Sequence, residues 1–210
     1  MVSTRRSCVA YFINPLEETG MEALKEKILT EGKAIGTEIV KVDSFLNHQM
    51  DVKFLEEIGK EFKKRFDGIT VDKIMTVEAS GIAIACMSAP YFGYPPVVFA
   101  KKAAPSTMNE GFYEAEAKSF TKGTVSKLKV AKQFISKDDK ILILDDFLAS
   151  GEAAAALAGI VSEAGAQVVG IGAVIEKGFQ GGSDRLRSKG YRVESLAVID
   201  KIEDGVITFK

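Results

Sequence analysis

The chain has 210 residues, 46% hydrophobic and 27% charged, and its formal net charge is −1. This length suits one folded domain, and the balanced charge argues against a general nucleic-acid-binding or polybasic membrane-binding protein. Two cysteines without zinc-type spacing and one histidine argue against a disulfide framework and exclude a histidine-based metal cluster within one chain. The cysteine usage indicates a reducing compartment, and no apolar run reaches the roughly 18 residues of a membrane helix, so we expect a cytoplasmic protein.

Residues 1–20 differ from the rest of the chain. They carry Arg5, Arg6 and an apolar run that is shorter than the ~7 to 15 residues of a signal-peptide core. No small-residue cleavage site follows this run. We expect the segment to be a disordered upstream leader or a non-native extension, with an organelle leader as the alternative. Residues 21–210 are then expected to form a single domain.

Two amphipathic helices are predicted at the start of this domain. Leu24, Ile28 and Leu29 lie on one side of a helix over residues 21–35, which Gly32 and Gly36 are expected to end. A second helix is predicted from an N-cap at Asp51 to about residue 66, because apolar residues recur there at helical spacing.

Short apolar runs then alternate with helical segments. Such runs, rather than strict apolar–polar alternation, indicate a parallel sheet covered on both faces, and therefore an α/β fold. The predicted elements are, in order, strand 72–77, helix 80–93, strand 95–102, strand 140–145, a helix to residue 164, strand 166–177, and a short helix followed by a strand within 183–199.

The segment between the second and third predicted strands does not fit this alternation. Residues 103–129 are polar, contain Pro105, Gly111 and Gly123, and have little helical or strand periodicity. Long irregular loops in compact α/β domains are commonly functional lids. We therefore predict a mobile loop over about residues 103–127.

The stretch "ILILDDFLASGEA", residues 141–153, is the strongest candidate for a functional site. Asp145 and Asp146 follow an apolar strand at the edge of the sheet where ligands bind, and Gly151 opens a helix. The unpaired N–H groups of a helix start suit a phosphate, whereas two carboxylates suit sugar hydroxyls or hydrated Mg²⁺. An ordinary strand–helix junction in which an Asp caps the helix is the alternative interpretation. The chain lacks a Walker A motif, which argues against a P-loop enzyme.

This stretch closely resembles the phosphoribosyl pyrophosphate (PRPP) motif of type I phosphoribosyltransferases. From residue 21 to the C-terminus, further segments such as "KVDSFLNHQMD", "VVFAKK" and "GIGAVIEKGFQ" resemble the xanthine phosphoribosyltransferases of that family. The resemblance implies the family fold, with a parallel twisted sheet flanked by helices, a small N-terminal hood and a mobile loop. The hood would comprise about residues 21–50 and pack with the loop near 177–182.

The implied reaction is the transfer of phosphoribosyl from PRPP to N9 of xanthine, with Mg²⁺ as cofactor and mainly held by PRPP. The resemblance makes Asp145 and Asp146 the catalytic pair at the ribose. It implies PRPP contacts from Ala79, Ser80, Gly81, Lys101, Lys102, Ala149, Ser150, Gly151, Glu152 and Ala153, and purine contacts from Val40, Asn47, Lys177 and Phe179. It also implies a homodimer.

The sequence departs from related purine enzymes in three places, one of which is the loop over residues 103–118, where the poor match prevents the transfer of individual lid contacts. Ala149 stands where some of them carry a carboxylate that acts as a base, and Ala153 stands where a threonine is common. A base at this turn is therefore not expected. The alternatives are a guanine or hypoxanthine phosphoribosyltransferase and a non-catalytic regulator that binds PRPP. The regulators that resemble this chain carry a DNA-binding domain before the core, for which the thirty or so residues between Met21 and Asp51 are too few.

Overall fold

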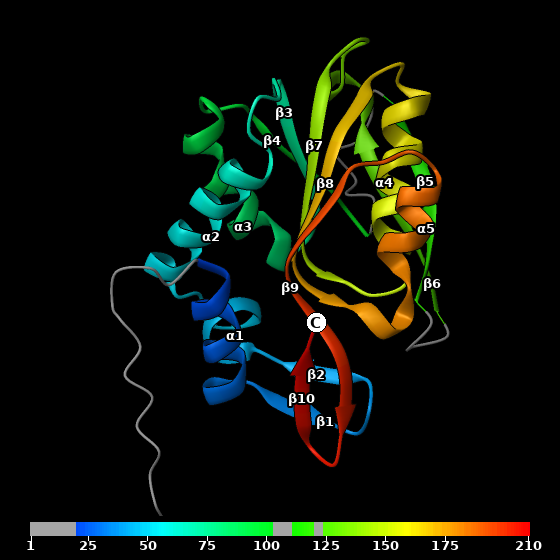
Figure 1. Ribbon diagram of the computed structural model, residues 1–210. Helices are drawn as coiled ribbons and strands as arrows, with labels where there is room; N and C mark the ends of the chain where they lie inside the picture. The colour runs from blue at the N-terminus through cyan, green and yellow to red at the C-terminus, as the bar shows by residue number, and fades with distance from the viewer. Residues whose placement is uncertain (1–19, 103–110, 120–123) are drawn as a thin grey trace, which may run out of the picture.

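The computed structural model describes residues 20–102, 111–119 and 124–210 (Figure 1). The predicted leader, residues 1–20, lies outside them except for Gly20. The helices are α1 (Gly20–Glu31), α2 (Val52–Arg65), α3 (Ser80–Ser88), α4 (Glu152–Glu163) and α5 (Gly182–Ser188). The strands are β1 (Lys33–Ile35), β2 (Ile39–Lys41), β3 (Lys73–Val77), β4 (Val97–Ala100), β5 (Phe112–Ser119), β6 (Thr124–Ala131), β7 (Lys140–Leu148), β8 (Gln167–Lys177), β9 (Val193–Glu203) and β10 (Val206–Phe209).

The central sheet has the strand order β10-β9-β8-β7-β3-β4. The strands from β9 to β4 run parallel, and β10 pairs antiparallel with β9. β4 therefore pairs on one side of β3 and β7 on the other, so the direction in which the chain adds strands to the sheet reverses at β3. Ligands bind in such sheets at this reversal, beyond the carboxyl ends of the strands. The predicted α/β fold with a parallel sheet is confirmed.

Helices cover both faces of this sheet because its strands are apolar on both sides. Along β7, Leu142 and Leu144 belong to the core cluster beneath α1, α2 and α3, whereas Ile141 and Ile143 belong to the cluster beneath α4. Figure 1 shows α2 and α3 on one side of β7 and β8, with α4 and α5 on the other. The helices of both layers thus pack against the strands whose ends form the site.

Two glycines of β8 allow α2 to pack closely against the sheet. A Cβ at Gly172 would lie 2.8 Å from a ring carbon of Phe62, and one at Gly170 would lie 2.5 Å from a ring carbon of Phe66. Both rings are fully buried. Gly170 and Gly172 therefore serve the close packing of α2 on the sheet.

The N-terminal predictions are partly right. Asp51 caps α2, and its carboxylate accepts a hydrogen bond of 3.1 Å from the Phe54 amide. The first helix was predicted four residues too long, since α1 ends at Glu31 and residues 33–35 form β1, which pairs with β2. Gly36, with a φ of 60°, makes the turn between these two strands. A glycine thus ends the helix, as expected, but a short hairpin follows it.

The expectation of little periodicity over residues 103–129 was wrong for the described part of that segment. β5 and β6 pair antiparallel from Phe112↔Ala131 to Ser119↔Thr124. Ala117, Leu128 and Val130 of this hairpin join the core cluster beneath α4. The alternation of these apolar residues with polar ones is a strand signal that the high polarity concealed. Residues 103–110 and 120–123 of the predicted mobile loop lie outside the described residues.

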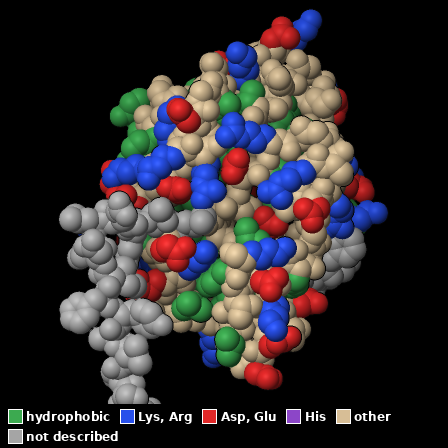
Figure 2. All heavy atoms as spheres, viewed as in Figure 1, with side chains coloured by type: hydrophobic (Ala, Val, Ile, Leu, Met, Phe, Trp, Pro, Cys, Tyr) green, Lys and Arg blue, Asp and Glu red, His purple; other side chains and the backbone are tan. Residues whose placement is uncertain are grey.

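Charged side chains of both signs are mixed over the face in Figure 2, and no large area of one sign appears there. Within the described residues, no helix is both long and apolar enough to cross a membrane.

Candidate functional site

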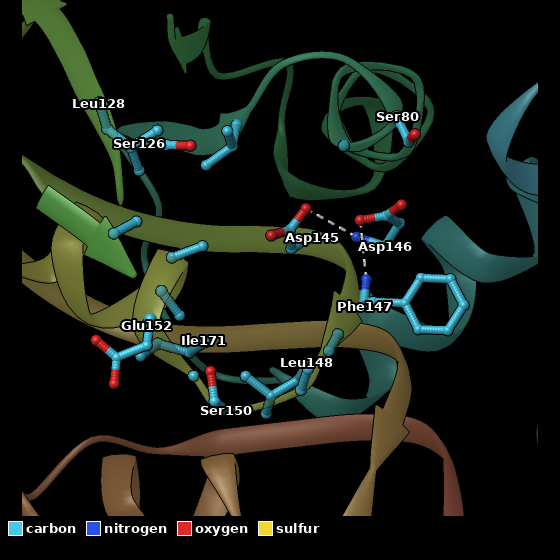
Figure 3. Close-up of a pocket in the computed structure, with 18 of the residues that line it drawn as sticks. Ser80, Ser126, Leu128, Asp145, Asp146, Phe147, Leu148, Ser150, Glu152 and Ile171 are labelled. Atoms are coloured by element: carbon cyan, nitrogen blue, oxygen red, sulfur yellow. Dashed lines mark hydrogen bonds between the residues drawn. The ribbon is translucent and has the colours of Figure 1, made fainter. Parts of the chain in front are cut away.

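A cavity of about 470 Å³ opens where β3 and β7 diverge. Its wall combines four segments: the junction of β3 with α3, the end of β7 with the turn into α4, the middle of β8, and the β5–β6 hairpin. In Figure 3, Ser126 and Leu128 of the hairpin lie on one side of Asp145, and Ser150 and Glu152 lie on the other. This is the position at which a parallel sheet of this order binds its ligand.

Asp145 and Asp146 lie inside β7, which continues to Leu148. The prediction ended this strand at residue 145, so the acids sit on a strand rather than after it. The Asp146 amide donates a hydrogen bond of 3.0 Å to Oδ1 of Asp145, and the Phe147 amide donates one of 2.9 Å to Oδ1 of Asp146 (Figure 3). Local backbone bonds thus fix both carboxylates at the cavity.

Burial raises the pKa of Asp145 well above its usual value, and the negative charge of Asp146 raises it further. The positive charge of Lys102 acts on this pKa in the opposite direction and is the smaller effect. An apolar surrounding and a second carboxylate therefore favour a protonated Asp145 until a cationic or hydrogen-bond-donating partner arrives.

Asn47 connects the N-terminal part of the chain to this pair. It lies in a π-helical turn, Asp43–Asn47, and its Nδ2 donates a hydrogen bond to Asp146 and one of 3.1 Å to Oγ of Ser80. Its Oδ1 is buried and has no hydrogen-bond partner among the described residues. Asn47 thus offers an unused acceptor beside the carboxylates.

The junction of β3 with α3 approaches Asp145 very closely. A Cβ at Gly81 would lie 1.9 Å from Oγ1 of Thr76 and 3.0 Å from Oδ1 of Asp145. Glu78, at the same junction, accepts a hydrogen bond of 2.7 Å from the Lys102 amide. This bond holds Lys102, the second residue after β4, at the cavity, and Lys102 lines its wall.

The turn from β7 to α4 has the geometry of an anion-binding loop. Gly151 adopts a φ of 80° and is the N-cap of α4, whose first amides are left without helical partners. Ala149, Ser150, Gly151, Glu152 and Ala153 all line the cavity. The positive end of the α4 dipole adds to these donors, so the turn suits a phosphate group.

Lys177 is the last residue of β8, the strand that pairs with β7, which carries the carboxylates. Burial lowers its pKa, and the charge of Glu38 partly offsets this effect. Its Nζ lies 5.7 Å from the ring centroid of Phe147. Phe179, the expected neighbour of this lysine, is 40% exposed, and Val40 is buried in the core cluster of the α2 face.

Comparison with known proteins agrees with this geometry. No family model matches the chain. Xanthine phosphoribosyltransferase 1 of Clostridium perfringens is 58% identical over 190 residues, which are 90% of this chain and all of that protein. The xanthine phosphoribosyltransferase of Clostridioides difficile is 53% identical with the same coverage. The chain belongs to the xanthine phosphoribosyltransferase family.

Solved structures of related enzymes share the fold. An adenine phosphoribosyltransferase of Rhodothermus marinus has a TM-score of 0.70 and 20% identity, covering 86% of this chain and 99% of that one. The corresponding enzyme of Trypanosoma brucei has a TM-score of 0.68 and 17% identity, covering 83% and 78%. The type I phosphoribosyltransferase fold is therefore confirmed.

Most of the residues that the family resemblance singled out lie together. The cavity wall contains Asp145, Asp146, Lys102, the Ala149–Ala153 turn and the residues Ala79, Ser80 and Gly81. Asn47 reaches this wall through its hydrogen bonds. Lys101, Val40, Lys177 and Phe179 do not line this cavity. The Lys101 ammonium instead lies 5.8 Å from the ring centroid of Phe99.

Several residues at the site were not predicted from the sequence, and three of them bear on its chemistry. Phe147 lies in the cavity wall beside Lys177, and Gln180 lines the same wall. Thr76 is fully buried, and its hydroxyl has no partner among the described side and main chains. A threonine inside an otherwise apolar strand was the available signal for the last of these.

One prediction follows from the raised pKa of Asp145. The folded protein keeps the Asp145 proton above the unfolded pKa of about 3.9, so stability falls as pH rises from there through the folded pKa. We expect Asp145→Asn to raise the unfolding temperature of the ligand-free protein at neutral pH, because the amide removes this buried charge. The gain should shrink towards pH 4, as thermal unfolding scans from pH 4 to 8 can measure.

The matched control for this scan is the exposed Asp184, replaced in the same way. A similar rise for Asp184→Asn, or a gain at position 145 that does not depend on pH, would contradict the assignment.

Proposed function

We propose that the protein transfers the phosphoribosyl group of PRPP to N9 of xanthine, giving xanthosine monophosphate and pyrophosphate in purine salvage. The observation that carries this proposal is that Asp145, Asp146 and the Ala149–Ala153 turn share one cavity at the sheet reversal. Relatives that match this chain over their whole length are named for xanthine, which supports the choice of base.

The proposed roles at the sugar follow from charge. Asp145 and Asp146 accept hydrogen bonds from the ribose hydroxyls and stabilise positive charge that develops at C1′ as its bond to pyrophosphate breaks. The backbone amides of Ala149–Ala153, with the Ser150 hydroxyl, bind the 5′-phosphate. Such a site works mainly by positioning both reactants and stabilising charge.

The pyrophosphate group is proposed to lie against the β3–α3 junction. Ala79, Ser80 and Gly81 supply the start of α3, and Lys102 supplies a cation at the cavity wall. Lys101 stays a predicted second cation, although its ammonium lies near Phe99. Negative charge on the departing group thus meets a helix start and a lysine.

Magnesium fits the residues at this position. The described residues hold no cluster of three or more His, Cys, Asp or Glu side chains that could form a protein cage for a metal. Mg²⁺ is commonly held by one or two carboxylates together with substrate phosphates, and Asp145 and Asp146 match that requirement. When bound, Mg²⁺ would neutralise charge on the pyrophosphate.

The purine is proposed to bind between the N-terminal hood, residues 21–50, and the loop at 177–182. The Lys177 ammonium would donate to a purine oxygen, and the free Oδ1 of Asn47 would accept from a purine N–H. Val40 and Phe179 stay predicted apolar contacts. Ala149 has no group that could accept the N9 proton, so another acceptor must take it.

Several features of the proposal come from the sequence composition or the family relationship and stay predictions. They are a homodimer, a cytoplasmic location and a lid over about residues 103–127 that excludes water from the activated sugar.

The decisive experiment is to incubate the protein with PRPP, Mg²⁺ and, separately, xanthine, guanine, hypoxanthine and adenine. We expect nucleotide and pyrophosphate to form fastest with xanthine. Formation of no nucleotide with any base would refute the enzymatic function, and faster turnover of guanine would refute the choice of substrate.

Lys177→Met tests the base contact. Removing a charged donor from a half-buried position should lower kcat/KM for xanthine by about 10²-fold, because the purine oxygen loses its partner. Steady-state kinetics at saturating PRPP measures this, with Lys189→Met as an exposed control. An unchanged kcat/KM would remove Lys177 from the purine site.

A further inference from the structure

Arg185, in α5, joins two parts of the site that are far apart in sequence. Its Nη2 donates hydrogen bonds to the carbonyl of Ser150 and, at 3.2 Å, to the carbonyl of Gln180. Ser150 belongs to the proposed 5′-phosphate turn, and Gln180 belongs to the turn that follows β8 on the purine side. Both residues line the main cavity, so one guanidinium connects its two walls.

The backbones of these two turns are in direct contact. A Cβ at Gly182 would lie 2.2 Å from the Ala149 carbonyl oxygen and 2.8 Å from the Gly151 nitrogen. A Cβ at Gly151 would likewise lie 3.1 Å from the Gly182 carbonyl oxygen. The phosphate turn therefore rests on the start of α5, and a shift of either segment would move the other.

The other end of this segment is anchored in the core. Glu176, the residue before Lys177, is 3% exposed, and its carboxylate accepts hydrogen bonds from the hydroxyls of Ser183 and Ser195, the latter at 2.6 Å. Buried carboxylates need such partners. The chain from Glu176 to Ser183 is thus fixed to β9 at its base, and Arg185 fixes it to the phosphate turn.

We propose that Arg185 is a positioning residue that holds the 5′-phosphate turn in its binding geometry and couples that turn to the purine side. The proposal rests on the proposed function for the identity of the ligands, although its test measures binding directly. A cation on the Ser150 carbonyl keeps that oxygen turned away from the phosphate, so the amides of the turn remain available as donors. Arg185 itself need not touch the substrate.

The test compares two probes that use different ends of the site. Ribose 5-phosphate requires the phosphate turn, whereas magnesium pyrophosphate is expected to bind the β3–α3 junction. For Arg185→Met, isothermal titration calorimetry should show about tenfold weaker binding of ribose 5-phosphate, the effect of losing a charge-assisted hydrogen bond. The affinity for pyrophosphate should stay within about twofold of the unsubstituted protein by the same reasoning.

Arg187→Met is the matched control, because it removes the same charge from the same helix. Arg187 donates to the Val193 carbonyl at 3.0 Å and not to the phosphate turn. Arg187→Met should bind both probes like the unsubstituted protein, and Arg185→Lys, which keeps a charged donor, should recover most of the lost affinity. In the transferase assay, Arg185→Met should raise KM for PRPP more than it lowers kcat.

Three results would overturn the proposal. They are equal weakening of both probes by Arg185→Met, unchanged ribose 5-phosphate binding in that variant, and the same loss in Arg187→Met. Failure of the proposed function gives a different pattern, because the unsubstituted protein would then form no nucleotide from PRPP. Its binding of the two probes could still be compared with that of the variants.

Discussion

Replacing Asp145 and Asp146 together by Asn is expected to reduce kcat by about 10³-fold, comparable to the removal of a major charge-stabilising group from an active site. Both carboxylates lie at the cavity wall, and each accepts a hydrogen bond from a backbone amide. The side-chain oxygen of Asn can accept the same hydrogen bond. The substitution therefore removes negative charge and preserves shape. The measurement is the rate of nucleotide formation at saturating PRPP and xanthine.

Circular dichroism and thermal unfolding provide the control for this variant. Because burial already raises the pKa of Asp145, the double variant should be at least as stable as the unsubstituted protein at neutral pH. Turnover within a factor of about three of the unsubstituted protein would contradict the charge-stabilising role. A loss of turnover accompanied by unfolding would mean that the pair serves the fold.

Gly182→Ala should have the second largest effect. Its Cβ would lie 2.2 Å from the Ala149 carbonyl oxygen, and backbone on both sides leaves little room to move. We expect kcat/KM for PRPP to fall by about 10²-fold, because the phosphate turn is displaced from its binding geometry. The free energy of unfolding should fall by about 1–3 kcal/mol, the usual range for overpacking.

Gly159→Ala is the matched control. This glycine lies within α4, and a Cβ there would meet nothing within 4 Å. The substitution should leave kcat/KM unchanged and stabilise the helix by up to about 1 kcal/mol. If Gly182→Ala behaves in the same way, the two turns are not packed tightly enough to position each other.

Much of the fold could be predicted because the parallel strands are largely apolar runs, and β3 and β7 lead directly into the helices α3 and α4. The acids at 145 and 146 and the glycine at 151 also fall where the local pattern places them, at the ligand-binding edge of the sheet. The β5–β6 hairpin was missed because its charged residues, such as Glu114 and Lys127, pair across the strands and make the sequence resemble a solvent-exposed loop.

The unpredicted parts of the site depend on contacts between distant segments. Neither the approach of Gly182 to Ala149 nor the bond from Asn47 to Asp146 leaves a local pattern in the sequence. Lys101 and Lys102 are adjacent and identical in type, yet only Lys102 lines the cavity. Lys101 pairs with Lys129 in an isolated β-bridge, whereas Lys102 lies beyond β4 and its amide donates to Glu78, and neither contact has a local sequence pattern.

The close packing of α2 on β8 has an evolutionary consequence. The rings of Phe62 and Phe66 occupy the space that side chains at positions 172 and 170 would fill. A larger residue at either position therefore requires the facing ring to become smaller, and at position 172 Leu144 must move as well, because a Cβ there would lie 2.6 Å from its Cδ2. Among relatives, these pairs should change together, and positions 170 and 172 should keep glycine wherever both aromatic residues are retained.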